Sequence, residues 1–385
     1  MRSWRPQNFV REGQLRGVDD DVINNAVLTA ARLRQRSPVL PPIFSLGHLA
    51  WLVGASYELL RDVVSRYTVD PYRSFQIRKR PLPGQGKRFR RICVPDTFLM
   101  LTQKWIASNL LVRVPAHSAS VAFSKGDRIV DAVQPHCEST WLIKMDVVNF
   151  FESIDERVVY RVFRRMGYQP LVSFELARLC TRIGAPTAAR RGRRWNPIRN
   201  SESKISSYEA PRLGHLPQGA PTSPMLANLA VIEMDERLSE VAGKAGFVYS
   251  RYADDLAFSS RRQLDRKSCR EVIASASAIL DVFGFSVNSA KTSVRPPGSR
   301  KVLLGLNANS VQPRLSRELR DRLLRHRYFL LHPQIGPAKH AKRLGFDSTI
   351  GFKNHLFGLV AYAAQVEPGF AMVLKEDLAQ ISWPL

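Results

Sequence analysis

Apolar residues spaced three or four positions apart predict helices near both ends of the chain. In residues 44–67 this pattern is interrupted at Gly54-Ala55-Ser56, and in residues 22–34 it predicts one helix inside a polar, basic start. Residues 313–330 carry leucines at four-residue spacing among many arginines, which predicts a basic amphipathic helix. The apolar stretch 355–362 is expected to form core beside that helix.

Two other apolar runs predict strands, and acids lie at their ends. One run, 141–146, ends in Asp146, and the other leads through Tyr252 to the adjacent acids Asp254 and Asp255. Neighbouring side chains of a strand face opposite ways, so two adjacent acids indicate a tight turn that brings at least one of them to a shared ion. An Asp-Asp pair alone is more often a solvated turn. Three acids on apolar strands favour a divalent-cation site, because buried carboxylates need a compensating charge.

A loop rich in Gly and Pro lies between the two acidic strands. It is Leu-Pro-Gln-Gly-Ala-Pro-Thr-Ser-Pro, residues 216–224, and an apolar helical stretch follows it. Thr222 or Ser223 is placed to cap that helix, and Pro224 fits its first turn. The small residues would let the loop backbone approach a flat partner such as a base pair.

In this order, the segments resemble the motifs of reverse transcriptases. The strand ending at Asp146, the Pro-Gln-Gly loop and Tyr-Ala-Asp-Asp look like motifs A, B and C, and the loop is most similar to that of bacterial retron enzymes. Residues 75–95 resemble the fingers motif, 284–292 motif D and 302–306 the primer grip. His136 matches the histidine of an Asn-Ala-x-x-His element common in retron enzymes, although the asparagine is absent, so another defence-associated class stays open.

The resemblance implies an α+β fold, the right-hand polymerase, with fingers, an antiparallel-sheet palm and a small helical thumb. It divides the chain into a basic N-terminal extension (1–40), fingers (41–140), a palm (141–310) with a basic insertion (182–212), and a thumb (311–385).

The resemblance also assigns catalytic roles. Asp146 and Asp254 would bridge two Mg²⁺ ions, for which Mn²⁺ could substitute, with Asp255 as a weaker or outer ligand and the carbonyl of Val147 completing the shell. Two such ions serve phosphoryl transfer. Lys291 matches the motif D lysine proposed to protonate the pyrophosphate leaving group.

Four further residues are expected at the incoming nucleotide. Lys79 and Arg90 lie on a predicted fingers hairpin and would clamp the triphosphate, while Gln218 would support the same nucleotide. Phe151 follows the first acid by five residues, where the resembled enzymes place an aromatic ring that excludes a 2′-hydroxyl. RNA-directed RNA polymerases have a second Asp there. The alternative is that Phe150 and Phe151 are core residues, although neighbouring strand residues face opposite ways.

Composition agrees with a nucleic-acid enzyme. Lys and Arg number 58 against 33 acids, so the net charge of +25 favours a polyanionic partner. The expected partners are an RNA template, taken to be a non-coding RNA, dNTPs, the DNA or RNA–DNA hybrid product, and an effector protein. No apolar run is long enough to span a bilayer, and the cysteines have neither zinc nor disulfide spacing, so no membrane and a cytoplasmic location are expected.

Positive charge is concentrated in two segments expected to hold nucleic acid by its phosphates. These are the insertion, for which a solvated loop is an equally good interpretation, and the thumb helix. Tyr252 would stack near the primer end. The arginines concerned are Arg190, Arg191, Arg193, Arg194, Arg317 and Arg320.

Three functions compete. The first is an RNA-directed DNA polymerase that copies a bound, dedicated RNA in a bacterial retron or antiphage system. The second is a template-independent nucleotidyltransferase or an RNA-templated RNA polymerase of the same fold, and the third is an RNA-binding protein with an inactive palm. The intact acids argue against the third, and Phe151 argues against an RNA polymerase. Template independence stays open.

Overall fold

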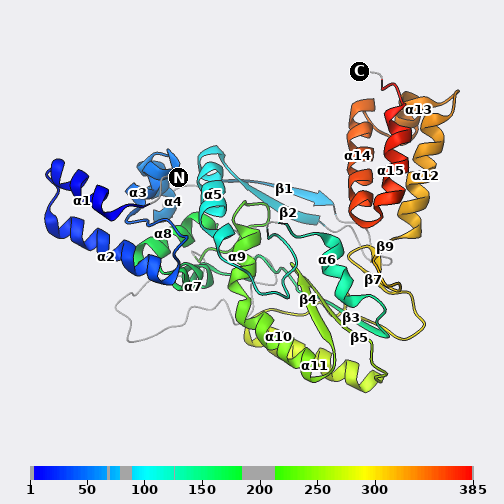
Figure 1. Ribbon diagram of the computed structural model, residues 1–385, viewed down its shortest axis with the longest axis horizontal. Coiled ribbons are helices and arrows are strands. Elements are labelled where there is room, and N and C mark those ends of the chain that lie inside the picture. Colours follow the sequence, from blue (N-terminus) through cyan, green and yellow to red (C-terminus); the bar gives the residue numbers. More distant parts are fainter. Residues whose placement is uncertain (1–3, 67–69, 79–88, 125, 184–212, 384–385) are drawn as a thin grey trace. The chain divides into compact units, whose positions relative to one another are not determined.

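The chain forms two compact units that interleave along the sequence. The computed structural model describes residues 4–66, 70–78, 89–124, 126–183 and 213–383 (Figure 1). Described residues of Met1–Lys125, Val147–Arg237 and Ser277–Asn288 make up the first unit. Those of Gly126–Asp146, Leu238–Ala276 and Ser289–Leu385 make up the second.

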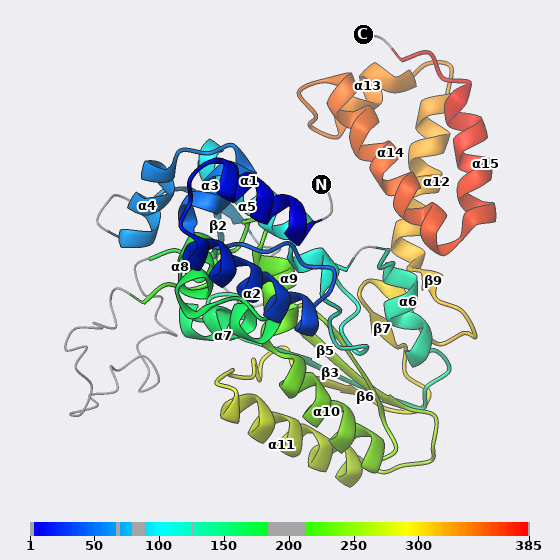
Figure 2. The ribbon, with the colours of Figure 1, turned by 60° about the vertical axis from the view of Figure 1, so that its left-hand side comes forward.

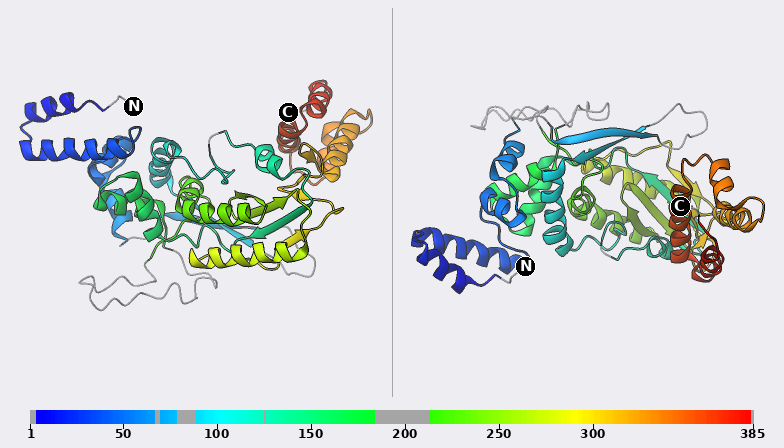
Figure 3. Two further views of the ribbon diagram at one scale, coloured as in Figure 1. Left: turned by 60° about the horizontal axis from the view of Figure 1, so that its bottom comes forward. Right: turned by 90° about the horizontal axis from the view of Figure 1, so that it is seen from above.

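Two helices, rather than one, form the N-terminal extension. Helices α1 (Pro6–Leu15) and α2 (Asp20–Arg36) lie side by side (Figure 3). The sequence predicted only α2, because the short α1 carries few apolar residues, Phe9, Val10 and Leu15, and none of them is buried. Its Phe9 instead contacts the rings of Trp4 and Phe44, at centroid distances of 4.8 and 5.6 Å.

The interrupted helical pattern that follows is confirmed. Helix α3 (Leu46–Val53) ends at Gly54, which adopts a left-handed φ of 72°. Ser56 then caps α4 (Tyr57–Ser65) by accepting a hydrogen bond from the Leu59 amide.

An antiparallel hairpin and a set of helices complete the first unit. The hairpin joins β1 (Tyr72–Arg78) to β2 (Phe89–Pro95), as predicted for the fingers. Buried Gln103 donates through its amide nitrogen to the Tyr72 hydroxyl and to the Leu179 carbonyl, both at 2.7 Å, so it ties the base of the hairpin to the helices. The helices are α5 (Thr97–Asn109), η1 (Leu111–Arg113), α7 (Glu156–Met166), α8 (Pro170–Cys180), α9 (Ser223–Ala230) and the start of α10 (Ile232–Lys244).

The second unit contains the predicted antiparallel palm sheet. Its strand order is β4-β5-β3-β6, and every neighbouring pair is antiparallel. The parts of α10 and of α11 (Arg266–Val282) that belong to this unit, residues 238–244 and 266–276, cover one face of the sheet (Figure 2). The strands are β3 (Trp141–Asp146), β4 (Val248–Tyr252), β5 (Asp255–Ser260) and β6 (Ser293–Arg295).

The C-terminal part of this unit is a small sheet followed by a helical bundle. The expected thumb helix was predicted to start at 313, which is wrong, because residues 314–315 pair as strand β9 and Ser316 caps the helix from Arg317 onward. Stretch 355–362 supplies core through Leu356 and Val360, as expected. The elements of this C-terminal part are β7 (Val302–Leu303), β8 (Leu306–Asn307), β9 (Arg314–Leu315), α12 (Arg317–Leu331), α13 (Gly336–Arg343), α14 (Thr349–Val366) and α15 (Pro368–Ala379). The same unit also contains α6 (Ile129–Val133) and η2 (Gln134–His136), which precede β3 in the chain.

The structure also describes the cysteines and the apolar character of the helices. All four cysteines are buried and free. Within the described ranges, no helix combines the length and the apolar character needed to cross a membrane.

Candidate active site

The three predicted acids lie at the ends of neighbouring strands in the second unit. Asp146, the last residue of β3, is directly opposite Asp255, the first residue of β5. Tyr252 of β4 is opposite Asp255 on the other side, so Ala253 and Asp254 form a two-residue turn. Ala253 has a φ of 55°, a left-handed conformation that costs a non-glycine residue energy and is found at functional turns.

Negative charge is concentrated at these strand ends, and lysines balance part of it. Burial, together with the Asp254 and Asp146 carboxylates, raises the pKa of Asp255 to about 6, while Lys144 and Lys291 act in the opposite direction. The buried Asp146 carboxylate accepts a hydrogen bond from the Lys291 ammonium at 2.5 Å. Lys291 therefore lies within the acidic cluster.

The donor set suits a hard divalent cation, because carboxylate oxygens are the ligands that Mg²⁺ and Mn²⁺ prefer. A cation would also relieve the repulsion that raises the pKa of Asp255. Among the described residues, however, no three His, Cys, Asp or Glu side chains are gathered tightly enough to hold an ion as they stand. A bound cation and the Lys291 ammonium would both be attracted to the Asp146 carboxylate, whose Oδ2 accepts the lysine hydrogen bond.

Two buried side chains that sequence analysis did not assign to the site support the acidic turn. Arg251, fully buried on β4, donates to the Ala253 carbonyl at 3.2 Å. His136 lies between β4 and β5, with Nε2 2.6 Å from the Ser250 hydroxyl and Nδ1 2.7 Å from the Ser259 hydroxyl. Burial lowers the pKa of His136 to about 4. Two features of the sequence could have identified these residues. Arg251 is a charged residue inside a predicted strand, and His136 matches the histidine of the retron element.

Tyr252 lies near a second tyrosine that the sequence did not single out. Burial and then Tyr252 raise the pKa of Tyr362, which belongs to α14. A Cβ at Gly305 would lie 3.8 Å from the Tyr362 hydroxyl. Leu304 and Gly305, with φ values of 50° and 84°, form the two-residue turn between β7 and β8 that matches the primer grip.

In the first unit, the Pro-Gln-Gly loop packs against the fingers hairpin. The Gln218 carbonyl accepts a hydrogen bond from the Cys93 amide at 2.7 Å, and Arg90 is exposed farther along the same strand, opposite Ile77. Gly219 has a φ of 111°, and a Cβ there would lie 2.7 Å from Cγ2 of Ile92. Gly219 therefore makes a close approach to β2, and contact of the loop with a base pair stays a prediction. Lys79 lies outside the described residues.

The capping prediction for the helix after this loop is wrong in part. Pro224 does occupy the first turn of α9, but neither Thr222 nor Ser223 caps the helix by its side chain. The buried Thr222 hydroxyl instead contacts the side-chain carbonyl of Gln103 at 3.4 Å. A partner inside the protein therefore competes successfully with the capping geometry.

The two phenylalanines after motif A have different surroundings. Phe150 is buried, and its ring centroid lies 5.4 Å from that of Phe285. Phe151 is only half-buried, with its centroid 6.3 Å from Phe123. The core therefore accounts for Phe150 alone, and contact of Phe151 with the sugar stays a prediction. Val147, the expected carbonyl ligand, is buried and pairs with Val287.

The two thumb arginines that were predicted to contact nucleic acid, Arg317 and Arg320, have different surroundings. Arg320 binds the Glu367 carboxylate at 3.0 Å and lies over the Phe370 ring, so it already stabilises the bundle. Arg317 is highly exposed, with Asp321 at 3.6 Å. The four insertion arginines, Arg190, Arg191, Arg193 and Arg194, lie outside the described residues.

Comparison with known proteins decides the family. The family described as reverse transcriptase (RNA-dependent DNA polymerase) matches residues 77–308, which include the two acidic strands, the Pro-Gln-Gly loop and the primer-grip hairpin. The chain belongs to the reverse transcriptase family. This match, with the antiparallel sheet, confirms the predicted polymerase fold and the predicted enzyme class, an RNA-directed DNA polymerase.

Retron enzymes are among its relatives. The chain is 28% identical over 336 residues to the retron Ec86 reverse transcriptase of Escherichia coli, covering 87% of this chain and 93% of that protein. It is 31% identical over 287 residues to the retron Mx162 reverse transcriptase of Myxococcus xanthus, covering 72% of this chain but only 56% of that protein. A solved telomerase from Candida albicans, in complex with a fragment of telomeric RNA, shares 13% identity, with a TM-score of 0.41, over 81% of this chain and 56% of that chain. The predicted likeness to retron reverse transcriptases is thus confirmed.

Proposed function

We propose that this reverse transcriptase copies a dedicated, bound RNA into DNA as the polymerase of a bacterial retron. The observation that carries the chemistry is the juxtaposition of Asp146 and Asp255 across β3 and β5, with Asp254 in the adjoining turn. The proposed biological setting rests on the similarity to the two retron enzymes. The proposed partners are a non-coding RNA, dNTPs, the DNA product and an effector protein, in the cytoplasm.

Asp146, Asp254 and Asp255 would hold two Mg²⁺ or Mn²⁺ ions, with the Val147 carbonyl as a further ligand. When bound, such ions favour attack by the primer hydroxyl and departure of pyrophosphate. Lys291 already lies 2.5 Å from Asp146, which supports its proposed role as the acid that protonates the leaving group. Its ammonium would reach the reaction from within the acidic cluster.

The remaining predicted residues would bind and select the nucleotide and primer. Arg90, exposed on β2, and Lys79 would hold the triphosphate, while Gln218 would support the same nucleotide from a loop fixed to β2. Phe151 would face the sugar and exclude the 2′-hydroxyl. Tyr252 would stack near the primer end.

Primer extension on an RNA template tests the acidic cluster. Asp254→Asn should abolish Mg²⁺-dependent incorporation while leaving the melting temperature unchanged or higher, because removing one carboxylate reduces like-charge repulsion. Asp281→Asn, an exposed position on α11, is the matched control and should retain parental synthesis. Appreciable synthesis by Asp254→Asn would overturn the site assignment.

The dedicated template needs a separate experiment. The protein is purified from a bacterium that carries its genomic neighbourhood, and the copurifying nucleic acid is sequenced. One non-coding RNA, joined by DNA copied from it, should dominate the reads. A broad sample of cellular transcripts would contradict the retron role while leaving the polymerase assignment intact.

A further inference from the structure

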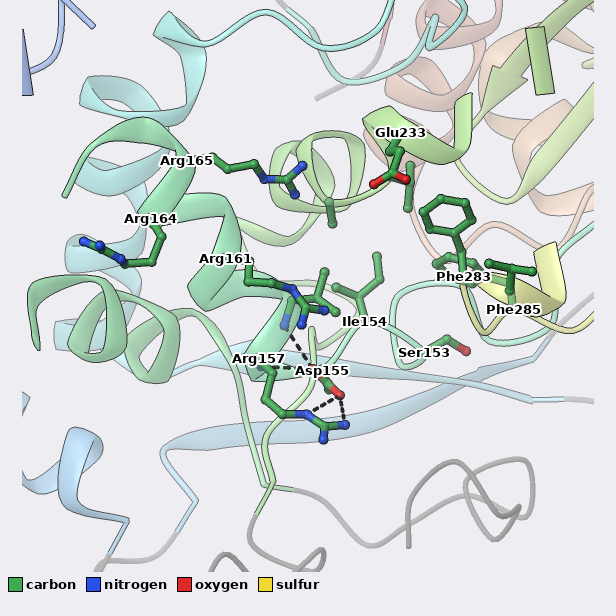
Figure 4. Close-up of a pocket in the computed structure, with 14 residues that line it drawn as sticks. Ser153, Ile154, Asp155, Arg157, Arg161, Arg164, Arg165, Glu233, Phe283 and Phe285 are labelled. Carbon is green, nitrogen blue, oxygen red and sulfur yellow. Dashed lines mark hydrogen bonds and ion pairs between the residues drawn. The ribbon is translucent and has the colours of Figure 1, made fainter. Parts of the chain in front are cut away.

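A cavity lies in the first unit, and none of the residues that line it is assigned above to catalysis or nucleotide binding. Its volume is about 520 Å³, which is within the range of small-molecule sites. Helix α7, the start of α10 and the segment that follows α11 enclose it (Figure 4). Ile154, Val158 and Val231 supply an apolar wall.

Two arginines give this cavity uncompensated positive charge. Arg161 and Arg165 are exposed, lie four residues apart on α7, and form no hydrogen bond or ion pair with any residue in the described part of the chain. Figure 4 shows both side chains extending from α7 over the cavity, while Arg164 is turned away from it. Guanidinium groups in such a pair match the oxygens of a phosphate.

The acids that line the cavity are already neutralised. Asp155 accepts hydrogen bonds from the Arg157 guanidinium at 2.6 Å and from the amides that begin α7. Glu233 is paired with Arg237, also at 2.6 Å. The positive charge of Arg161 and Arg165 is therefore not balanced within the cavity, so the cavity favours an anionic ligand.

An aromatic ring provides the second recognition element. Phe283 is half-buried at the wall, and the Arg237 guanidinium lies 5.1 Å from its ring centroid. The guanidinium covers one face of the ring, and the other face can serve as a stacking platform for a nucleobase. The cavity thus combines an anion-binding edge with a flat apolar surface, two groups that a nucleotide presents together.

We propose that this cavity binds a nucleoside phosphate, with the phosphate on Arg161 and Arg165 and the base against Phe283. The nucleotide is either free or an unpaired residue of a bound strand, since both present the same chemistry. The site is additional to the polymerase centre and does not depend on the retron role. An acidic peptide would neutralise the arginines, but its Asp and Glu side chains have no flat group that could stack on the Phe283 ring.

Binding is measured by calorimetry on the full chain without divalent ions, so that the metal-dependent nucleotide site contributes little. The probes are adenosine 5′-monophosphate, ribose 5-phosphate and a six-residue oligoadenylate. The double variant Arg161→Ala/Arg165→Ala should weaken the parent's binding of the tighter adenylate probe by at least about tenfold. The matched control is Arg266→Ala/Arg270→Ala, which removes two exposed arginines at the same spacing from α11.

Phe283→Leu tests the base contact while keeping an apolar side chain at the wall. It should weaken adenylate binding several-fold and leave ribose 5-phosphate binding at its parental value. Primer extension, run in parallel, should be unchanged in the Arg161→Ala/Arg165→Ala variant. If the parent protein showed no primer extension, the polymerase proposal would fail. The binding measurements would still test the proposed nucleotide site in the cavity.

Each further outcome is decisive. Comparable binding of the mononucleotide and the oligonucleotide identifies a free nucleotide as the ligand. Binding of the oligonucleotide alone identifies a strand at this cavity if the Arg161→Ala/Arg165→Ala variant loses that binding, and overturns the proposal if the variant keeps it. Unchanged binding in the α7 double variant, an equal loss in the α11 control, or tighter binding of a glutamate-rich peptide than of either adenylate would overturn the proposal.

Discussion

Phe150 and Phe151 are adjacent in the chain, but only Phe151 keeps part of its ring exposed. If Phe151 contacts the incoming sugar, Phe151→Ala should allow ribonucleotide incorporation that the parent rejects. Phe150→Leu is the control, because Phe150 packs against Phe285 and should lose stability without a change in sugar choice. Relative incorporation of dNTPs and rNTPs on one RNA template measures both. Unchanged selectivity in an active Phe151→Ala enzyme would show that the ring has only a packing role.

His136 should make the second unit sensitive to acid. Burial lowers its pKa from 6.5 to about 4, so between these values the unfolded chain binds a proton that the folded chain does not. The free energy of unfolding should therefore fall as the pH drops from about 6.5 to 4, by on the order of 3 kcal/mol from this group.

Denaturant titrations across this pH range test the effect. His136→Gln, which cannot take up the proton, should show a shallower decline than the parent, whereas His355→Gln, at an exposed position, should follow the parental curve. Parallel curves for the parent and His136→Gln would mean that the histidine is not held neutral between Ser250 and Ser259.

At the scale of elements, the contact between the Pro-Gln-Gly loop and β2 leaves no room for a side chain. Gly219→Ala combines a left-handed φ with a Cβ only 2.7 Å from Cγ2 of Ile92 and 3.2 Å from the Cys93 carbonyl. Gly54→Ala is the control, because Gly54 has a φ of 72° but open space where the Cβ would lie. It should lower the free energy of unfolding by about 1–2 kcal/mol through backbone strain alone. Gly219→Ala should cost roughly 1–3 kcal/mol more. Equal losses of unfolding free energy would show that the loop moves away from β2 freely.

Much of this element structure could be predicted from the sequence, and the exceptions have physical causes. The strands at Asp146 and Asp255 and the break at Gly54 follow from side-chain alternation and from glycine's access to left-handed backbone. Helix α1 was missed because its ten residues include only three large apolar ones, too few for a clear helical pattern. The start of α12 was placed too early because Leu315 continues the helical spacing while its amide bonds to Glu367, far away in the chain.

At the site, too, residues that belong to a local motif could be predicted, whereas residues whose role depends on distant partners could not. The acids and Lys291 were identified by motif and lie together in the second unit. Arg251, His136 and Tyr362 were not assigned, because their importance depends on partners that the sequence alone does not pair with them.

At the scale of the whole molecule, a net charge of +25 implies strong, salt-dependent binding to RNA. If the insertion contacts phosphates, replacing its four arginines with Ala should lower the slope of log affinity against log salt by somewhat under about one unit for each lost contact. The loss should be similar for unrelated RNA sequences. The replaced residues are Arg190, Arg191, Arg193 and Arg194.

A charge-matched variant separates this local effect from net charge. It replaces four exposed arginines of the N-terminal extension and should keep more of the parental slope, as measured by binding isotherms at several salt concentrations. Parental slope and affinity in the insertion variant would mean that the insertion does not touch RNA, and a loss confined to one RNA would mean that it recognises sequence or shape. The control residues are Arg11, Arg16, Arg32 and Arg34.

The hydrogen bond from the Cys93 amide to the Gln218 carbonyl has a kinetic consequence. Arg90 and Cys93 belong to one strand, so a displacement of that strand would carry the Gln218 backbone with it. If a bound nucleotide displaces the fingers hairpin, Arg90 would reach the triphosphate at the same time as the loop brings Gln218 to the nucleotide. Arg90 and Gln218 should therefore govern one step of the catalytic cycle, and their substitution should give non-additive losses in the rate of nucleotide capture.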